Sequence, residues 1–161
     1  MTDRRLATEH DSAEESPGLL LWQVTNSWQA AQRAALKPYG LTHVQFVLLA
    51  SLAWLDGEGP VTQRQLADHA ATDPMMTSQV LRVLEQRALI RRAHHPDDGR
   101  AVAVSVTAEG VALANRANAA VETCDRDYFA PLGSRLSGFA GALRVLRGGW
   151  PPRIRPRGRV D

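Results

Sequence analysis

Hydrophobic and polar residues alternate along the chain with two different periods, and these periods predict its helices and strands. The spacing typical of a helix first occurs between Leu19 and Lys37, before Pro38 interrupts it. One face of this predicted helix carries Leu21, Val24, Trp28, Ala31 and Ala35. A second helix begins at Thr42, with Gln45 three residues later as in a capping box, and is apolar on most sides. We therefore expect the second helix to lie in the core.

Two shorter helices and a hairpin are predicted for the next segment. The third helix begins at Thr62, again with a glutamine, Gln65, at the capping-box position. A three-residue turn follows, and the fourth helix has Asp73 as its N-cap and Pro74 in its first turn. Two strand-like segments, "LIRRA" and "AVAVSV", enclose the polar loop "HHPDDGR". This order predicts a helix-turn-helix followed by a β-hairpin, or wing.

Two further helices complete the predicted fold. Thr107 caps a long alanine-rich helix that runs to Phe129, and Pro131 and Gly133 separate it from a final helix. That final helix is expected to begin near Leu132, with an apolar ladder of Leu132, Leu136, Phe139, Leu143 and Leu146. The expected fold class is therefore mainly α with a small β-wing, a winged helix-turn-helix with six helices.

Length and composition favour one compact domain with polar ends. The 161 residues suit a single domain, which we expect over residues 19–147. Residues 1–18 are polar and acid-rich and predict a mobile arm, whereas residues 148–161 predict a disordered arginine-rich tail. No secretory signal or membrane-spanning run occurs, and the single cysteine, Cys124, favours a reducing compartment. We therefore expect a cytoplasmic protein.

The basic residues are nearly all arginine, which bears on the choice of partner. The net charge is only +2, but of the 19 basic residues only Lys37 is lysine. A guanidinium group binds a phosphate or a guanine edge with two hydrogen bonds at once. Arg153, Arg155, Arg157 and Arg159 concentrate this charge near the C-terminus, where a mobile tail would touch DNA phosphates without reading sequence. An inert extension is the alternative.

Several segments, in the right order, resemble the MarR family of transcriptional regulators. They are "GLTHVQFVLLASLA", "VTQRQLADHAATDPMMTSQVLRVLEQRALIRR" and "PDDGRAVAVSVTAEG", and the resemblance spans roughly Leu19 to Leu146. It implies a DNA-binding region over residues 41–106 and dimerisation helices over residues 19–37 and 107–147. It also implies a homodimer that acts on a palindromic double-stranded DNA operator as a ligand-responsive repressor, with half-sites about one helical turn apart.

The fourth helix has two faces suited to packing and to reading DNA. Its expected core face carries Met76, Val80, Val83 and Leu84, and its expected reading stripe carries Met75, Ser78, Gln79, Arg82 and Gln86. The amide of Gln79 is suited to adenine, and the guanidinium of Arg82 to guanine or a phosphate. An ordinary polar surface stripe is the alternative, which the preceding short helix and the following wing make less favourable.

The wing supplies a second expected contact with DNA. By resemblance, Arg100 enters the minor groove, and Asp98 holds its side chain extended through a charge-assisted bond. Of Arg91 and Arg92, we expect one to face DNA and the other to face the dimer body or an acidic neighbour. The full set of expected DNA contacts is Thr62, Gln63, Pro74, Met75, Thr77, Ser78, Gln79, Arg82, Asp98 and Arg100.

The resemblance also implies a small aromatic effector bound between the two regions. Residues that could line such a pocket are Trp22, Trp28, His43, Phe46 and Trp54. Aromatic residues at helical spacing are also common core residues, so packing remains the alternative.

Other chemistries are less well supported by the sequence. His94 and His95 are adjacent on a hairpin tip and lack metal-ligand spacing, so we expect no metal or other cofactor. Cys124 lies on an apolar stripe, which favours a buried, inert thiol over a redox sensor. Nucleophile-elbow, phosphate-loop and metalloprotease motifs do not occur, so we expect no enzyme. A winged-helix module that binds proteins and not DNA is the remaining alternative.

Overall fold

The computed structural model describes residues 6–55 and 59–149, and the chain divides into two compact units, residues 1–124 and 125–161. The helices are α1 (Pro17–Leu36), α2 (His43–Leu55), α3 (Gln63–Ala70), α4 (Pro74–Gln86), α5 (Ala108–Phe129) and α6 (Leu136–Gly149). The strands are β1 (Val61–Thr62), β2 (Ile90–His94) and β3 (Val102–Val106). Short 3₁₀ turns are η1 (Ala13–Glu15), η2 (Lys37–Tyr39) and η4 (Ala130–Arg135). This arrangement confirms the predicted mainly helical fold with a small wing.

Local capping residues set the helix starts, as the sequence predicted. The Thr42 hydroxyl accepts the Gln45 N–H at 3.3 Å, while the Gln45 side chain accepts the Thr42 N–H at 3.0 Å. The same reciprocal pair joins Thr62 and Gln65 at the start of α3. Asp73 caps α4 by accepting two backbone N–H groups at 2.9 Å each. Each cap satisfies donors that a helix start otherwise leaves without a partner.

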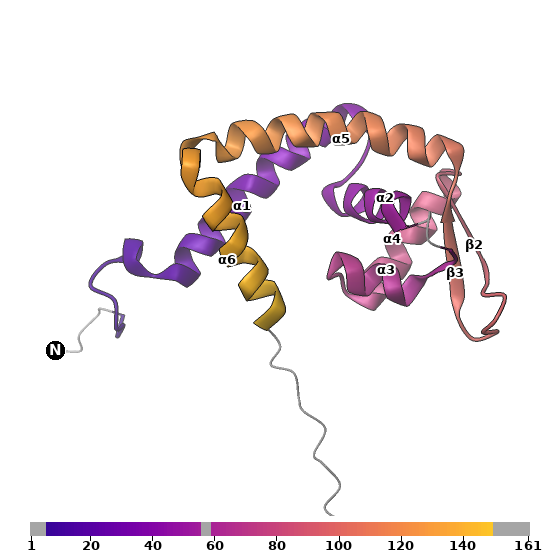
Figure 1. The fold of residues 1–161 in the computed structure, drawn as a ribbon, viewed down its shortest axis with the longest axis horizontal. Helices are drawn as coiled ribbons and strands as arrows, with labels where there is room; N and C mark the ends of the chain where they lie inside the picture. Colours follow the sequence, from indigo (N-terminus) through magenta and orange to yellow (C-terminus); the bar gives the residue numbers. More distant parts are fainter. Residues whose placement is uncertain (1–5, 56–58, 150–161) are drawn as a thin grey trace, which may run out of the picture. The chain divides into compact units, whose positions relative to one another are not determined.

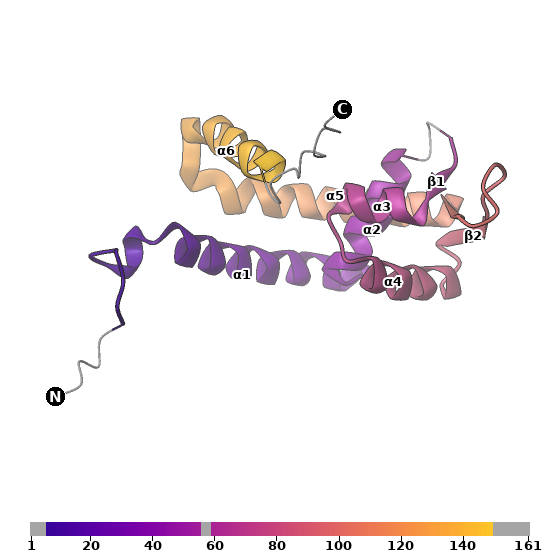
Figure 2. The same cartoon turned by 90° about the horizontal axis from the view of Figure 1, so that it is seen from below.

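Helix α1 begins earlier than predicted. The Ser16 hydroxyl accepts the Leu19 N–H at 3.3 Å, and Pro17 occupies the first helical position. The end of the predicted polar arm is therefore structured, with η1 before the cap and Pro17 and Gly18 inside α1. Both views show the N-terminal part of α1 reaching away from α2, α3 and α4 (Figures 1 and 2).

The wing is part of a three-stranded antiparallel sheet in the order β1-β3-β2. Ile90 lies opposite Val106 and Arg92 opposite Val104, while Val61 of β1 pairs with Val104 from the other side. The sequence did not predict β1, because two residues are too few for an alternating pattern. Because β2 stands at the end of the order β1-β3-β2, it is an edge strand of the described sheet.

The core lies where α2, α3 and α4 meet the base of this sheet. Its fully buried apolar side chains are Leu36, Leu48, Leu49, Leu52, Leu66, Leu81, Leu84, Ile90 and Val104. The predicted burial of α2 is thus confirmed. Helix α5 joins this core through Leu113, Ala114, Ala117 and Val121. At its start, a Cβ on Gly110 would overlap the carbonyl oxygen of Leu89, so glycine is needed for this close approach.

Two alanines with left-handed backbone conformation end the helices of the helix-turn-helix. Ala71 has φ +52° after α3, and Ala88 has φ +57° after α4. In each case the next residue closes the helix end: the Thr72 N–H bonds the Ala67 carbonyl, and the Leu89 N–H bonds the Leu84 carbonyl, both at 3.0 Å. Glycine usually occupies this position, because a Cβ raises the energy of the left-handed conformation.

The second unit contains η4 and α6. Aromatic side chains pack within it, with the ring centroids of Phe129 and Phe139 5.9 Å apart. The final helix begins at Leu136, after Gly133 with φ +51°, and not near Leu132 as predicted. It reaches Gly149, so the start of the predicted tail is helical, whereas the tail arginines at 153–159 lie outside the described residues. In the described part of the chain, every helix is too short or too polar to span a membrane.

Candidate nucleic-acid interface

The outward face of α4 carries the polar stripe expected to read DNA. Met75, Gln79, Arg82 and Gln86 are exposed, and Ser78 is half-buried. These side chains recur at the spacing of one helical face, which suits insertion into a major groove. Their exposed positions are consistent with the sequence hypothesis.

Thr77 is a correction to the expected set of DNA contacts. Its side chain is 0% exposed, and its hydroxyl donates to the Asp73 carbonyl at 2.8 Å. The Thr72 hydroxyl lies 2.8 Å from the Thr77 hydroxyl and, as the remaining donor, completes a chain of hydrogen bonds through the turn before α4. Thr77 therefore stabilises the turn of the helix-turn-helix and does not face a ligand.

The core face of α4 is rotated relative to the sequence prediction. Thr77, Leu81 and Leu84 are buried, whereas Met76 and Val83 are each 40% exposed. Hydrophobicity alone predicted Met76 and Val83 for the core. Thr77 is buried there instead. Its hydroxyl forms hydrogen bonds within the turn, so the desolvation cost of burying it is small.

The start of α3 adds a cation that the sequence reasoning missed. Arg64 is exposed and lines a groove of about 420 Å³ together with Gln63, Asp98 and Arg100. The expected contacts Thr62 and Pro74 also lie on this side, at the starts of α3 and α4. The Thr62 hydroxyl is occupied by the capping box, so Thr62 acts chiefly as a cap. Arg64 follows that cap by two positions, which is the signal that could have identified it.

The wing tip holds Arg100 through its backbone. The Asp98 carboxylate accepts the Arg100 N–H at 3.0 Å, and the Asp98 carbonyl accepts the Ala101 N–H at 3.0 Å. Within residues 6–55 and 59–149, no ion pair joins the side chains of Asp98 and Arg100. The expected charge-assisted bond is therefore replaced by a tight turn, from which the exposed Arg100 guanidinium extends.

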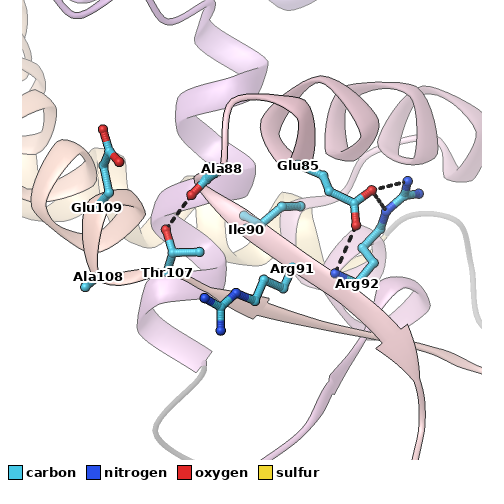
Figure 3. A pocket seen from close by; sticks show the side chains of 8 residues that line it. All are labelled: Glu85, Ala88, Ile90, Arg91, Arg92, Thr107, Ala108 and Glu109. Carbon is cyan, nitrogen blue, oxygen red and sulfur yellow. Dashed lines mark hydrogen bonds and ion pairs between the residues drawn. The ribbon is translucent and has the colours of Figure 1, made fainter.

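Arg91 and Arg92 point to opposite sides of β2 (Figure 3). Arg92 binds Glu85 of α4, with its Nε and Nη2 donating to Oε2 at 2.9 and 2.6 Å. These hydrogen bonds and the positive charge hold the pKa of Glu85 below its ordinary value. The expectation of an acidic neighbour is confirmed for Arg92. Arg91 is exposed and lines a pocket of about 590 Å³ with Glu109 at the start of α5.

Only part of the predicted aromatic set comes together. The rings of Trp28 and His43 meet edge to face with centroids 5.0 Å apart, and Phe46 is buried one turn further along α2. Trp54 is 83% exposed and lies eleven residues beyond His43, about 16 Å along the helix. Trp22 is 69% exposed, about 9 Å before Trp28 on α1. Trp22 and Trp54 therefore do not join this cluster.

The sequence also raised the wing histidines as candidate metal ligands and Cys124 as a candidate redox residue. The Asp97 N–H donates to His95 Nδ1 at 3.1 Å, which gives this histidine a role in the turn. Among the residues that the structure describes, no three histidine, cysteine, aspartate or glutamate side chains gather as a metal site would require. Cys124 is half-buried on α5, so the buried thiol predicted from the apolar stripe is corrected to a partly accessible one.

Comparisons with known proteins agree on one family. The MarR family model matches residues 41–102, the segment from the start of α2 to the wing. The chain is 41% identical over 133 residues to YdcH of Bacillus subtilis (strain 168), described as an uncharacterized HTH-type transcriptional regulator. That match covers 82% of this chain and 90% of YdcH.

A second relative has a solved structure. The HTH-type transcriptional repressor Rv2887 of Mycobacterium tuberculosis is 36% identical over 74% of this chain and 85% of its own. Its complex with salicylic acid matches at a TM-score of 0.63 and 34% identity, over 84% of this chain and 98% of that one. The fold also matches the S. aureus MepR–DNA complex at a TM-score of 0.74 and 19% identity, over 83% and 98% of the two chains. The chain belongs to the MarR family of helix-turn-helix transcriptional regulators.

Proposed function

We propose that this protein is a sequence-specific double-stranded DNA-binding repressor that acts as a homodimer on a palindromic operator. The observation that carries the proposal is the pairing of two exposed features in one unit: the polar stripe of α4 and the Arg100 guanidinium at the wing tip. Gln79 and Arg82 would read base edges in the major groove, while Arg100 would enter the adjacent minor groove. Family members are regulators and not enzymes, in keeping with the lack of catalytic motifs.

Contacts with the DNA backbone would hold this arrangement in register. Arg64 and Gln63 lie beside Arg100 around one groove, so their side chains are placed to meet phosphates next to the minor groove. The Ser78 hydroxyl and the start of α4 at Pro74 would add further contacts with the backbone. Phosphate contacts of this kind position the protein without reading sequence.

Exposed apolar side chains support the dimer. On α1 they are Leu19, Leu20, Leu21, Trp22 and Val24, and on α6 they are Leu136, Leu143, Val145 and Leu146. Apolar surface of this extent is typical of a protein–protein interface. We place the dimer interface on residues 19–37 and 107–147, as the sequence predicted.

A small aromatic acid is the proposed effector. The support is the edge-to-face pair of Trp28 and His43 beside the buried Phe46, together with the solved complex of Rv2887 with salicylic acid. An imidazole and an indole offer hydrogen-bond donors and a flat apolar surface, which suit a ring that carries a carboxylate.

A salt titration of DNA binding tests the proposal. Affinity for a random duplex should fall steeply as salt rises, because binding releases counterions from the phosphates. Arg100→Ala should lower affinity for a selected operator by about tenfold or more, with an unchanged thermal melt. Duplex binding that is absent, or that does not respond to salt, would favour a protein-interaction module instead.

A further inference from the structure

One ion pair joins α4 to the wing across the turn between them. Glu85 lies in the last turn of α4, and Arg92 is the third residue of β2. Besides the two guanidinium bonds, the Glu85 Oε1 accepts the Arg92 backbone N–H at 3.2 Å. Figure 3 shows the carboxylate of Glu85 directed at both groups of Arg92. A single carboxylate thus holds both the side chain and the main chain of one wing residue.

The backbone bond is significant because of the position of β2 in the sheet. Strand β2 is an edge strand, and its only neighbour in the described sheet is β3. The Arg92 N–H points away from β3 and is satisfied by Glu85. The carboxylate therefore occupies a donor on the open edge, which both fixes the strand and shields that edge.

The other attachments of the wing lie at its base. The Thr107 N–H donates to the Leu89 carbonyl at 3.0 Å, and the Thr107 hydroxyl donates to the Ala88 carbonyl at 2.8 Å. These bonds join the start of β2 to the start of α5 and not to the reading face of α4. Arg92 is nearer to the tip, so its bonds to Glu85 resist rotation of the hairpin about that base.

We propose that Arg92 is a positioning residue: through Glu85 it fixes the wing relative to α4, so that Arg100 and the α4 stripe contact DNA together. Arg92 itself does not contact DNA, although it is an arginine on the wing. This inference rests on the proposed DNA-binding function. A half-exposed ion pair contributes little to global stability, so its loss should act mainly on the placement of the wing.

A double-mutant cycle tests this role. The affinity of the full-length protein for its selected operator is measured for the wild type, Arg92→Gln, Arg100→Ala and the double variant. If Arg92 holds the wing in place, the loss caused by Arg100→Ala shrinks from about tenfold or more in the wild type to less than about threefold in the Arg92→Gln background. Glu85→Gln should reduce the Arg100→Ala loss in the same way.

Arg91→Gln is the matched control, since it removes one arginine from the same strand without touching Glu85. In this background the loss from Arg100→Ala should remain at its wild-type value. Arg92→Lys keeps the positive charge but lacks the planar guanidinium and its several N–H donors. In this background the loss from Arg100→Ala should lie between its values in the wild type and in Arg92→Gln. Thermal melts of all variants check folding, and Arg92→Lys replaces Arg92→Gln in the cycle if the latter does not fold.

Three outcomes would overturn either the positioning role of Arg92 or the proposed DNA-binding function. If the fold-losses in operator affinity from Arg92→Gln and Arg100→Ala simply multiply in the double variant, the positioning role is overturned and the proposed function stays intact. A salt slope that falls by about one in Arg92→Gln would show that Arg92 binds a phosphate, which also overturns the role. A wild-type protein with no salt-dependent duplex binding would instead overturn the proposed function, whatever the variants do.

Discussion

The outer faces of α4 and α1 are both exposed, but they differ in chemistry. The face of α4 carries Gln79 and Arg82, whereas the start of α1 carries Leu20, Leu21 and Trp22. A polar face is well solvated alone and can bind and release a charged partner, but an apolar face of this size favours a lasting partner. The contrast supports the proposal that the α4 face makes reversible contact with DNA and the α1 face forms a lasting dimer interface.

The largest expected effect comes from placing a charge on the apolar face. Trp22→Arg should raise the dimer dissociation constant by about 30-fold or more, because burying an unpaired guanidinium opposes association. Sedimentation over a range of concentrations measures the constant. Gln79→Arg adds the same charge to the polar face of α4 and should leave the dimer unchanged; equal effects of the two variants would remove the distinction between the faces.

Substitutions on the polar face should change base preference. Gln79→Ala or Arg82→Ala should relax selection at one position of each half-site by about 1–3 kcal/mol, because a bidentate contact to a base edge is lost. Binding to a panel of single-base operator variants measures this, with Trp22→Arg as the variant expected to keep the same preferences. Identical relative penalties in all proteins would show that the reading stripe is wrongly placed.

Substitutions of two adjacent residues on α4, Thr77 and Ser78, should affect stability and DNA binding separately. Thr77→Val should lower the free energy of unfolding by about 1 kcal/mol, since the hydrogen bonds to Asp73 and Thr72 are lost, without changing base preference. Ser78→Ala should do the reverse, with weaker DNA binding and little change in stability. Urea titrations and operator binding report the two properties, and a Thr77→Val protein with normal stability would contradict the assigned role.

The stability of the DNA-reading region can also be raised without touching either face. Ala88→Gly should stabilise the protein by up to about 1 kcal/mol, because glycine adopts the left-handed conformation without the Cβ penalty. Ala119→Gly, in the exposed middle of α5, should instead destabilise it by about 1 kcal/mol. A lower melting temperature for Ala88→Gly would show that this penalty is not present.

The smallest expected effect is on pH dependence. The pKa of Glu85 is lowered in the folded protein by Arg92, so the stabilisation from this pair is complete above the unfolded pKa and is lost as pH falls through the folded pKa. We expect wild type and Glu85→Gln to differ by less than about 1 kcal/mol at neutral pH, and by progressively less below about pH 4.5. Urea titrations across that range measure the difference, and a gap that widens in acid would contradict the sign.

Local signals in the sequence were sufficient for much of the fold. The caps at Thr42, Thr62 and Asp73 depend on near neighbours, and the structure confirms each of them. Thr77 could not be assigned from hydrophobicity, because its burial depends on hydrogen bonds within one turn and on how α4 packs against α2. The Glu85–Arg92 pair joins two elements across a turn, so neither periodicity nor a motif identified it.

In the proposed function, the DNA-binding regions of two protomers, held together by an apolar interface, recognise one operator. Selection of bound sequences from a random duplex library tests this most directly. We expect the wild type to recover an inverted repeat with half-sites about one helical turn apart. The Trp22→Arg variant, used at the same concentration, should not recover this repeat. A single asymmetric site, or no enrichment by the wild type, would contradict the account.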